Sequence, residues 1–200
     1  MIETFLFIPS CTGPLHAGHV FNLLCNLSLY EKSSATAKRF ITLIDNAQGP
    51  RVDEEEALAN VVDLLPPDGE IVQLINEEAQ HSMPEEPAGS PLSASPMWVM
   101  WQKLAFFSRH NVKQLARGND LRYHHKWEKD LVQCYTTWLG VPKMYFHPHI
   151  VDGNGKLSAS SGVDYGYTHD DLGFALAARD WNMDLLPLNL LFPDVPIQKR

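Results

Sequence analysis

Short apolar runs alternate with longer segments of helical periodicity in the first part of this chain. The first run, residues 5–8, leads through a junction rich in Gly and Pro into an apolar-periodic segment that ends near Tyr30. The polar stretch 32–39 follows, and then a second run, 40–44, which is apolar and β-branched enough for a buried parallel strand. The pattern predicts a strand, a tight turn, a helix, a loop and a second strand.

The middle of the chain shows helical patterns separated by a proline-rich break. Residues 54–65 predict a helix with acidic residues in its first turn, stopped by prolines 66–67, and residues 71–80 predict a second, short helix. Four prolines with Gly and Ser make residues 82–96 a loop, and the large apolar side chains of 97–110 predict a buried helix.

The remaining segments continue the alternation of strand and helix. We expect strands at 112–116 and 144–150, helices at 123–139 and 168–179, a turn at 153–155, and polar segments at 117–121 and 156–162. Alternating β and α elements predict an α/β fold with a doubly wound parallel sheet. We expect a single catalytic-type domain over residues 1–200, with a reduced acidic and Pro-rich insertion around 46–96.

Composition narrows the class of protein. The chain has 200 residues, of which 44% are hydrophobic, enough for one domain with a sizeable core. No apolar run is long enough to cross a membrane and the first residues do not resemble a signal peptide, so we expect a cytoplasmic protein without a membrane partner. Three widely spaced cysteines predict neither a disulfide framework nor a thiolate zinc site.

Charge is distributed unevenly along the chain. The net charge is -8, and twelve acidic residues against one basic residue, Arg51, lie between Asp45 and Glu86. An acidic surface is the expected meaning of that segment, because phosphate backbones are bound by Lys and Arg. The imbalance disfavours RNA binding there without excluding it.

The junction between the first strand and the first helix carries candidate chemistry. His16 and His19 are three residues apart, so in a first helical turn both project from one face beside backbone N–H groups that lack intrahelical partners. The helix dipole and these amides favour an anion, and Gly13 and Gly18 allow a nucleotide to approach closely. The junction therefore predicts an ATP-binding site.

Two alternatives for the histidine pair stay open. The histidines are also compatible with surface positions that cap a helix. They are equally compatible with two ligands of a metal completed by His147 and His149.

The junction resembles the Pro-x-x-Thr-Gly-x-Leu-His-x-Gly-His signature of class I aminoacyl-tRNA synthetases, most closely the glutamyl and glutaminyl branch. Further matches follow in the order found in that branch: Arg117-Gly118-Asn119-Asp120, Leu139-Gly140, His147-Pro148-His149 and Lys156-Leu157-Ser158-Ala159-Ser160. The matches span about the first four fifths of the chain.

The resemblance implies activation of a carboxylic acid by adenylation, in which the carboxylate attacks the α-phosphorus of ATP and pyrophosphate leaves. Mg²⁺ would bridge the phosphates and keep several waters, so no metal site built from protein residues is expected. The implied catalytic residues are His16, His19 and Lys156. The implied ATP contacts are Pro9, Thr12, Gly13, His16, Gly18, His19, Gly118, Asn119, Lys156, Ser158 and Ser160. The implied substrate contacts are Leu6, Asp45, Trp98, Arg117 and Asp120.

Departures from the branch bear on the substrate. Ala159 replaces the second lysine of the Lys-Leu-Ser-Lys loop found in the family, which implies slower activation. Leu6 replaces the arginine that binds the glutamate side chain, and an apolar residue cannot form that bidentate pair. Asp45 keeps a carboxylate suited to a substrate amino group, and Trp98 replaces a tyrosine at the pocket wall. We therefore expect an amino acid other than glutamate.

The acceptor of the activated acid is not identified by the sequence. The interval that holds the acceptor-stem insertion in the family is short and acidic here, and no anticodon-type tRNA recognition is expected. A small molecule, a carrier protein and a tRNA nucleoside stay open as acceptors. Two other functions stay open as well: a nucleotidylyltransferase of the His-x-Gly-His superfamily, and a non-catalytic regulatory or binding protein derived from a synthetase.

Overall fold

The computed structural model describes about half of the chain, in several separate ranges. These are residues 1–9, 15, 17–45, 58–59, 61–74, 96–118, 121, 128–129, 139–147, 150–152, 155–156 and 195–196. Their elements are β1 (Glu3–Phe7), α1 (Ala17–Lys32), β2 (Lys38–Ile44), η1 (Val62–Leu64), β3 (Glu70–Gln73), α3 (Pro96–Arg109), β4 (Gln114–Gly118), β5 (Lys143–His147), β6 (Ile150–Asp152), β7 (Gly155–Lys156) and β8 (Val195–Pro196).

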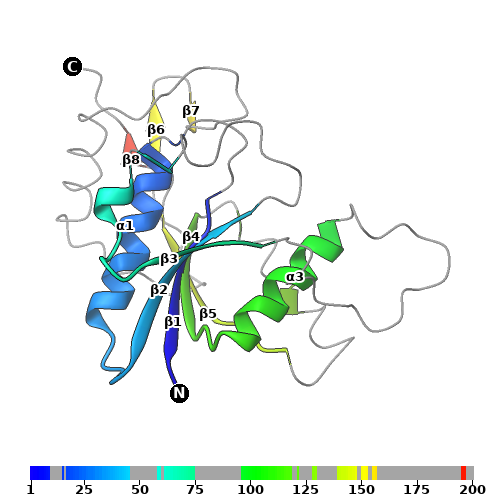
Figure 1. Ribbon diagram of the computed structural model, residues 1–200. Helices are drawn as coiled ribbons and strands as arrows, with labels where there is room; N and C mark the ends of the chain where they lie inside the picture. Colours follow the sequence, from blue (N-terminus) through cyan, green and yellow to red (C-terminus); the bar gives the residue numbers. More distant parts are fainter. Residues whose placement is uncertain are drawn as a thin grey trace.

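The longer strands run parallel to one another. β2 pairs with β1 on one side and with β3 on the other, and β4 pairs with β5. A parallel bridge between Thr4 and Val112, at the start of β1 and just before β4, connects the three-stranded group to the β4–β5 pair. The carboxyl ends of the strands consequently lie at one edge (Figure 1). The α/β arrangement with parallel strands confirms this part of the fold prediction.

Helices cover both faces of the strands because successive side chains of a strand point to opposite sides. Phe5, Phe7 and Phe40 belong to the apolar cluster that contains the buried side of α1. Leu6 and Ile41, which alternate with them, belong to the cluster that contains the buried side of α3. Figure 1 shows α1 and α3 on opposite sides of the strands. Burial on both faces explains why these strands are almost continuously apolar.

The two helices follow from their apolar spacing and their end residues. In α1, the buried positions Val20, Leu24 and Leu27 recur at helical intervals, and in α3 Trp101 and Leu104 do the same. The predicted helices ending near residue 30 and spanning 97–110 are confirmed as α1 and α3. α3 begins with Pro96, and a proline is favoured in a first helical turn because its missing N–H has no intrahelical partner there.

The segment from residue 71 is a strand, so the predicted short helix at 71–80 is wrong where the structure describes it. Ile71 and Val72 are β-branched, and β3 pairs in parallel with Thr42 and Leu43 of β2. The edge of β2 offers unpaired backbone groups, and pairing with them outweighs the weak local helical pattern. A turn closed by a hydrogen bond from Gly69 N to Pro66 O, 2.8 Å long, leads into β3.

Other boundaries shift by a few residues. The predicted helix at 54–65 is described only at residues 58–59, which are helical, and as the 3₁₀ turn η1. The strand predicted at 112–116 is β4, which extends to Gly118. The strand predicted at 144–150 divides into β5 and β6. The loop predicted at 82–96 lies outside the described residues except for Pro96, which is the first residue of α3 and not part of a loop. Of the polar loop predicted at 156–162 only Lys156 is described, and the helix at 168–179 and most of the helix at 123–139 lie outside the described residues.

A second, small sheet is formed near the C-terminal part of the chain. β6 pairs antiparallel with β7 and parallel with β8, and Asp152 lies opposite Gly155. The chain therefore reverses direction between these two residues, where the sequence predicts a turn. Lys156 lies in β7 and not in a loop as predicted, because it pairs with Val151. Within the described ranges, no helix is long and apolar enough to span a membrane.

Candidate functional site

The candidate site lies at the carboxyl edge of the parallel strands. Pro9 follows β1 and Asp45 follows β2, while Gly118 and His147 are the last residues of β4 and β5. A hydrogen bond from Asp45 N to Pro9 O, 3.1 Å long, keeps the ends of β1 and β2 together. In open parallel α/β sheets ligands bind outside this edge, because the connections there leave a crevice.

The first turn of α1 brings Gly18 and His19 to this edge. Both residues are half-buried, and each takes part in an interaction within the protein. The helix runs from the carboxyl edge towards the amino edge, so the positive end of its dipole lies beside the strand ends. This end of the helix favours an anionic ligand. His16 lies outside the described residues.

A buried network of amides connects α1 to β4. Asn26, which is 1% exposed, accepts a hydrogen bond from Ala116 N (2.9 Å) and donates through Nδ2 to Ala116 O (3.0 Å). The side chain thereby makes the two hydrogen bonds that a neighbouring strand makes with a residue of a sheet. Asn22, one turn earlier, also donates to Ala116 O (3.0 Å).

The direction of this network determines the protonation of His147. Ala116 N–H is a fixed donor, so the atom of Asn26 that faces it is the oxygen, and Nδ2 faces Oδ1 of Asn22 at 3.3 Å. Asn22 Nδ2 is then directed at His147 Nε2, 3.0 Å away. Because Nδ2 can only donate, Nε2 must accept, and the imidazole is neutral with its proton on Nδ1. Phe21 contacts the same ring edge-on, with centroids 5.1 Å apart.

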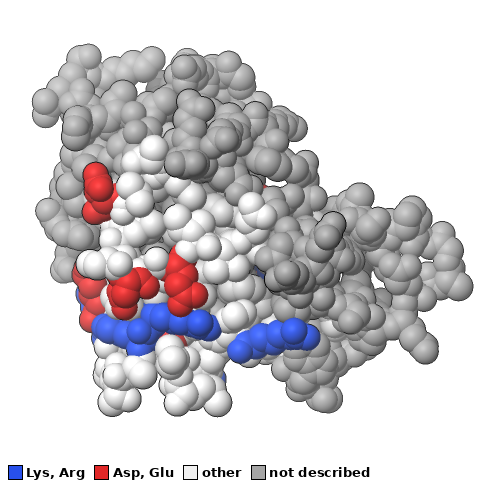
Figure 2. Space-filling model, in the orientation of Figure 1, with Lys and Arg blue, Asp and Glu red and all other residues white. Residues whose placement is uncertain are grey.

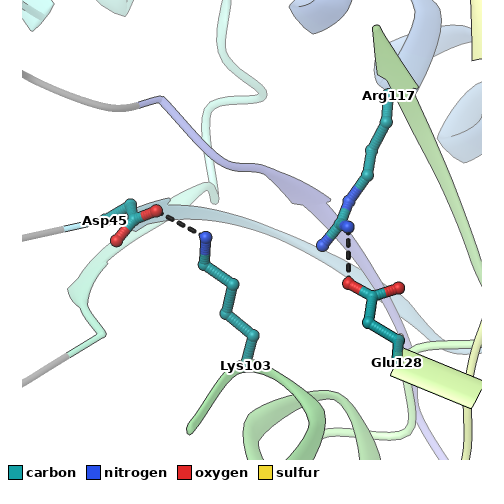
Figure 3. Close-up of polar contacts among 4 residues, drawn as sticks. All are labelled: Asp45, Lys103, Arg117 and Glu128. Carbon is teal, nitrogen blue, oxygen red and sulfur yellow. Dashed lines mark hydrogen bonds and ion pairs between the residues drawn. The ribbon is translucent and has the colours of Figure 1, made fainter. Parts of the chain in front are cut away.

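An ion pair lies at the end of β2, on the side of the strands that α3 covers. Lys103 Nζ of α3 is 2.5 Å from Asp45 Oδ2, and the two side chains are 20% and 19% exposed (Figure 3). Sequence reasoning identified Asp45 and missed Lys103. The signal was present, because Lys103 is a single cation within the first twelve, otherwise uncharged positions of α3.

A second, more deeply buried ion pair lies at the end of β4. Arg117 Nη1 is 2.6 Å from Glu128 Oε1, and the side chains are 9% and 2% exposed (Figure 3). The guanidinium carbon also lies 5.8 Å from the ring centre of Phe107 in α3. Arg117 is therefore engaged in the protein interior, on the same side of the strands as Lys103.

The structure sorts the predicted residues onto two sides of β1. Leu6, Asp45 and Arg117, all expected to contact the substrate, lie on the α3 side, whereas Gly18 and His19, expected to contact ATP, belong to α1 on the opposite side. Leu6 is 0% exposed and lies within the apolar core, so it adds no surface to the site.

The other predicted residues are placed only in part. Trp98 is in the first turn of α3, and its side chain is not described. Figure 1 shows β7, which contains Lys156, at the same end of the molecule as the start of α1. The predicted site residues that lie outside the described part of the chain are Thr12, Gly13, His16, Asn119, Asp120, Ser158 and Ser160.

Charges of both signs occur on the described surface. On the face shown in Figure 2, basic side chains form a band at the end of the molecule where the N-terminus lies, with acidic side chains beside them. Arg39 and Glu70 belong to this end and approach within 3.8 Å. Among the described residues, no group of three or more His, Cys, Asp or Glu side chains is arranged to hold a metal ion.

Comparison of the sequence with models of known protein families gives no match, and comparison with curated protein sequences gives none. The resemblance to class I synthetases therefore rests on the ordered sequence motifs alone.

Proposed function

We propose that this protein binds ATP at the carboxyl edge of its parallel strands and activates a carboxylic acid as an acyl adenylate. The acid is an amino acid other than glutamate, or a related carboxylic acid. The acceptor is a small molecule, a carrier protein or a tRNA nucleoside. The fold proposed with this activity is the doubly wound, Rossmann-like sheet of class I synthetases, and the neighbour order β3-β2-β1-β4-β5 implied by the Thr4–Val112 bridge supports it.

One observation carries the proposal: Gly18 and His19, implied for ATP, belong to α1 on one side of β1, and the described residues implied for the acid lie on the α3 side. Adenylation joins two reactants, so the site must hold the α-phosphate and the carboxylate in contact and their remaining parts apart. His19 is on the α1 side, and Asp45 is on the α3 side. β1, which ends at Phe7, lies between the two sides.

The proposed roles follow from charge. The start of α1 and His19 bind phosphoryl oxygens, and Lys156 stabilises the negative charge that develops on the leaving pyrophosphate. Mg²⁺ is carried by the phosphates themselves. Ser158 and Ser160 supply hydroxyl donors, and His16 acts together with His19. These roles come from the family resemblance, and the role of Lys156 is compatible with Figure 1, in which β7 lies at the same end of the molecule as the start of α1.

The test is exchange of labelled pyrophosphate into ATP, measured with each amino acid and with a set of simple carboxylic acids. We expect exchange with at least one acid, and we expect His19→Ala and Lys156→Ala to lower its rate by about 10²-fold, the typical effect of removing one group that stabilises developing charge. His110→Ala is the matched control, because His110 follows α3 at the opposite, amino edge. It should leave the exchange rate unchanged.

Three results would contradict the proposal. Exchange with glutamate alone would show that Leu6 has been misread. Turnover of a nucleotide or of phosphopantetheine, without acid-dependent exchange, would indicate a nucleotidylyltransferase. ATP binding without any exchange, unaffected by His19→Ala, would indicate a non-catalytic protein. If exchange is found, labelling of bulk tRNA before and after ribonuclease treatment identifies or excludes an RNA acceptor.

A further inference from the structure

We propose that Lys103 is a specificity-determining residue, and that the acid activated at this site carries no free amino group beside its carboxylate. This inference rests on the proposed function, because it concerns the substrate of the same site. It changes the role expected of Asp45. The sequence predicts that the Asp45 carboxylate binds the ammonium group of a substrate, whereas in the structure it binds the ammonium group of Lys103.

The geometry of the pair carries the inference. Lys103 Nζ lies 2.5 Å from Asp45 Oδ2, so the two charged groups are in direct contact (Figure 3). Asp45 has at least one further interaction within the protein. The backbone of Asp45 is itself held by the bond from its N–H to Pro9 O. The carboxylate is therefore fixed in position and already engaged.

The surroundings of Lys103 keep the ammonium at this place. Lys103 precedes the buried residue Leu104 in α3, and only about one fifth of its side chain is exposed. Long basic side chains commonly bury their aliphatic part while the charged end stays at a polar partner, which here is Asp45.

A second ammonium at Asp45 would be repelled by Lys103. Attraction to the carboxylate and repulsion from the lysine nearly cancel, so an amino acid gains little from its amino group and still has to dehydrate it. An acid without that group avoids this cost. Arg117 is likewise paired with Glu128 on this side of the strands, so the Asp45–Lys103 and Arg117–Glu128 pairs together contribute no net charge. This favours an uncharged body on the substrate.

The experiment compares matched acids that differ only in the amino group. Leucine is compared with 4-methylpentanoate, and phenylalanine with 3-phenylpropanoate, in pyrophosphate exchange by the wild-type protein. We expect kcat/KM to favour the acid without the amino group by about 10-fold or more, because the ammonium of the amino acid is dehydrated without gaining a net attraction.

Two variants of Lys103 test its part in this preference. Lys103→Met should shift the preference towards the amino acid by about 10-fold or more, because Asp45 then lacks its ammonium. Lys103→Arg keeps the charge and should keep the wild-type preference. Lys143→Met is the matched control, since Lys143 is an exposed lysine at the start of β5, on the amino edge. It should change neither rate nor preference.

A double-mutant cycle with Asp45→Asn and Lys103→Met, read as stability to urea, tests the pair without any substrate. Additive effects in the cycle would overturn the inference, as would a wild-type preference for the amino acid or equal use of both acids. A different result would overturn the proposed function itself: neither the wild type nor the variants catalyse pyrophosphate exchange with any acid, although the cycle shows that Asp45 and Lys103 are coupled. The role of Lys103 in substrate choice would then be overturned as well. If Lys103→Met does not fold, the wild-type preference still decides the question.

Discussion

Replacing Asn26 by alanine should be among the most damaging changes to the stability of this fold. Its carboxamide binds both backbone groups of Ala116, and both residues are 1% exposed. No water can replace the lost groups without entering the core beside α1. The side chain of Asn26 connects α1 to β4. The bridge between Thr4 and Val112 in turn keeps the start of β4 beside β1.

The magnitude follows from the bonds that are lost. In Asn26→Ala the N–H of Ala116 loses its acceptor, and a buried unsatisfied donor costs about 1–3 kcal/mol. The oxygen of Ala116 keeps a donor, Asn22 Nδ2, so its loss is limited to about 1 kcal/mol. The sum is about 3 kcal/mol, a large part of the roughly 5–15 kcal/mol that stabilises a typical domain. Asn22→Ala leaves both bonds between Asn26 and Ala116 in place, but it removes one donor to Ala116 O and the donor to His147 Nε2, and should cost about 2 kcal/mol.

The assay is urea unfolding followed by circular dichroism, with Asn26→Leu as the matched variant. Leucine has the same number and branching of side-chain heavy atoms as asparagine but cannot hydrogen-bond, so it should destabilise the protein at least as much as alanine does. If Asn26→Leu were as stable as the wild type, the volume of the side chain would matter and its hydrogen bonds would not, and the reasoning would be refuted. A larger loss for Asn22→Ala than for Asn26→Ala would refute it as well.

Three further predictions concern single side chains. Thr42→Val should raise the free energy of unfolding by about 1 kcal/mol, because the buried Thr42 hydroxyl has no hydrogen-bond partner within the described structure; an unchanged or lower urea midpoint would contradict this. Burial, and then the charge of Arg39, lowers the pKa of His110 below its ordinary value of 6.5. The unfolded chain therefore protonates His110 at a higher pH than the folded protein does, so stability should fall as the pH drops below about 6.5. His110→Asn should flatten the pH dependence of the melting temperature. Burial raises the pKa of the Cys25 thiol to about 12, so mass-spectrometric mapping after iodoacetamide treatment should find Cys25 unmodified in the folded protein and modified in urea.

Much of the candidate site was predictable because its residues lie beside strand ends that the sequence marks clearly. Apolar runs identify β1 and β2, and the residues that follow them, Pro9 and Asp45, must then lie at the carboxyl edge. The polar partners were not predictable in the same way. Lys103 lies 58 residues after Asp45, and Glu128 lies 11 residues after Arg117. No local sequence pattern pairs residues at these separations.

The sequence by itself determined the alternation of strands and helices, the two-sided burial of the strands and the histidine-bearing start of α1, because all of these follow from local spacing and composition. Tertiary structure alone decided that residues 70–73 form a strand, since the edge of β2 supplies hydrogen bonds that no local propensity can offer. It also decided that Asn26 takes the place of a strand beside Ala116 and that Lys103 reaches Asp45. Contacts between distant residues depend on how elements approach one another in space, and that information is spread over the whole chain.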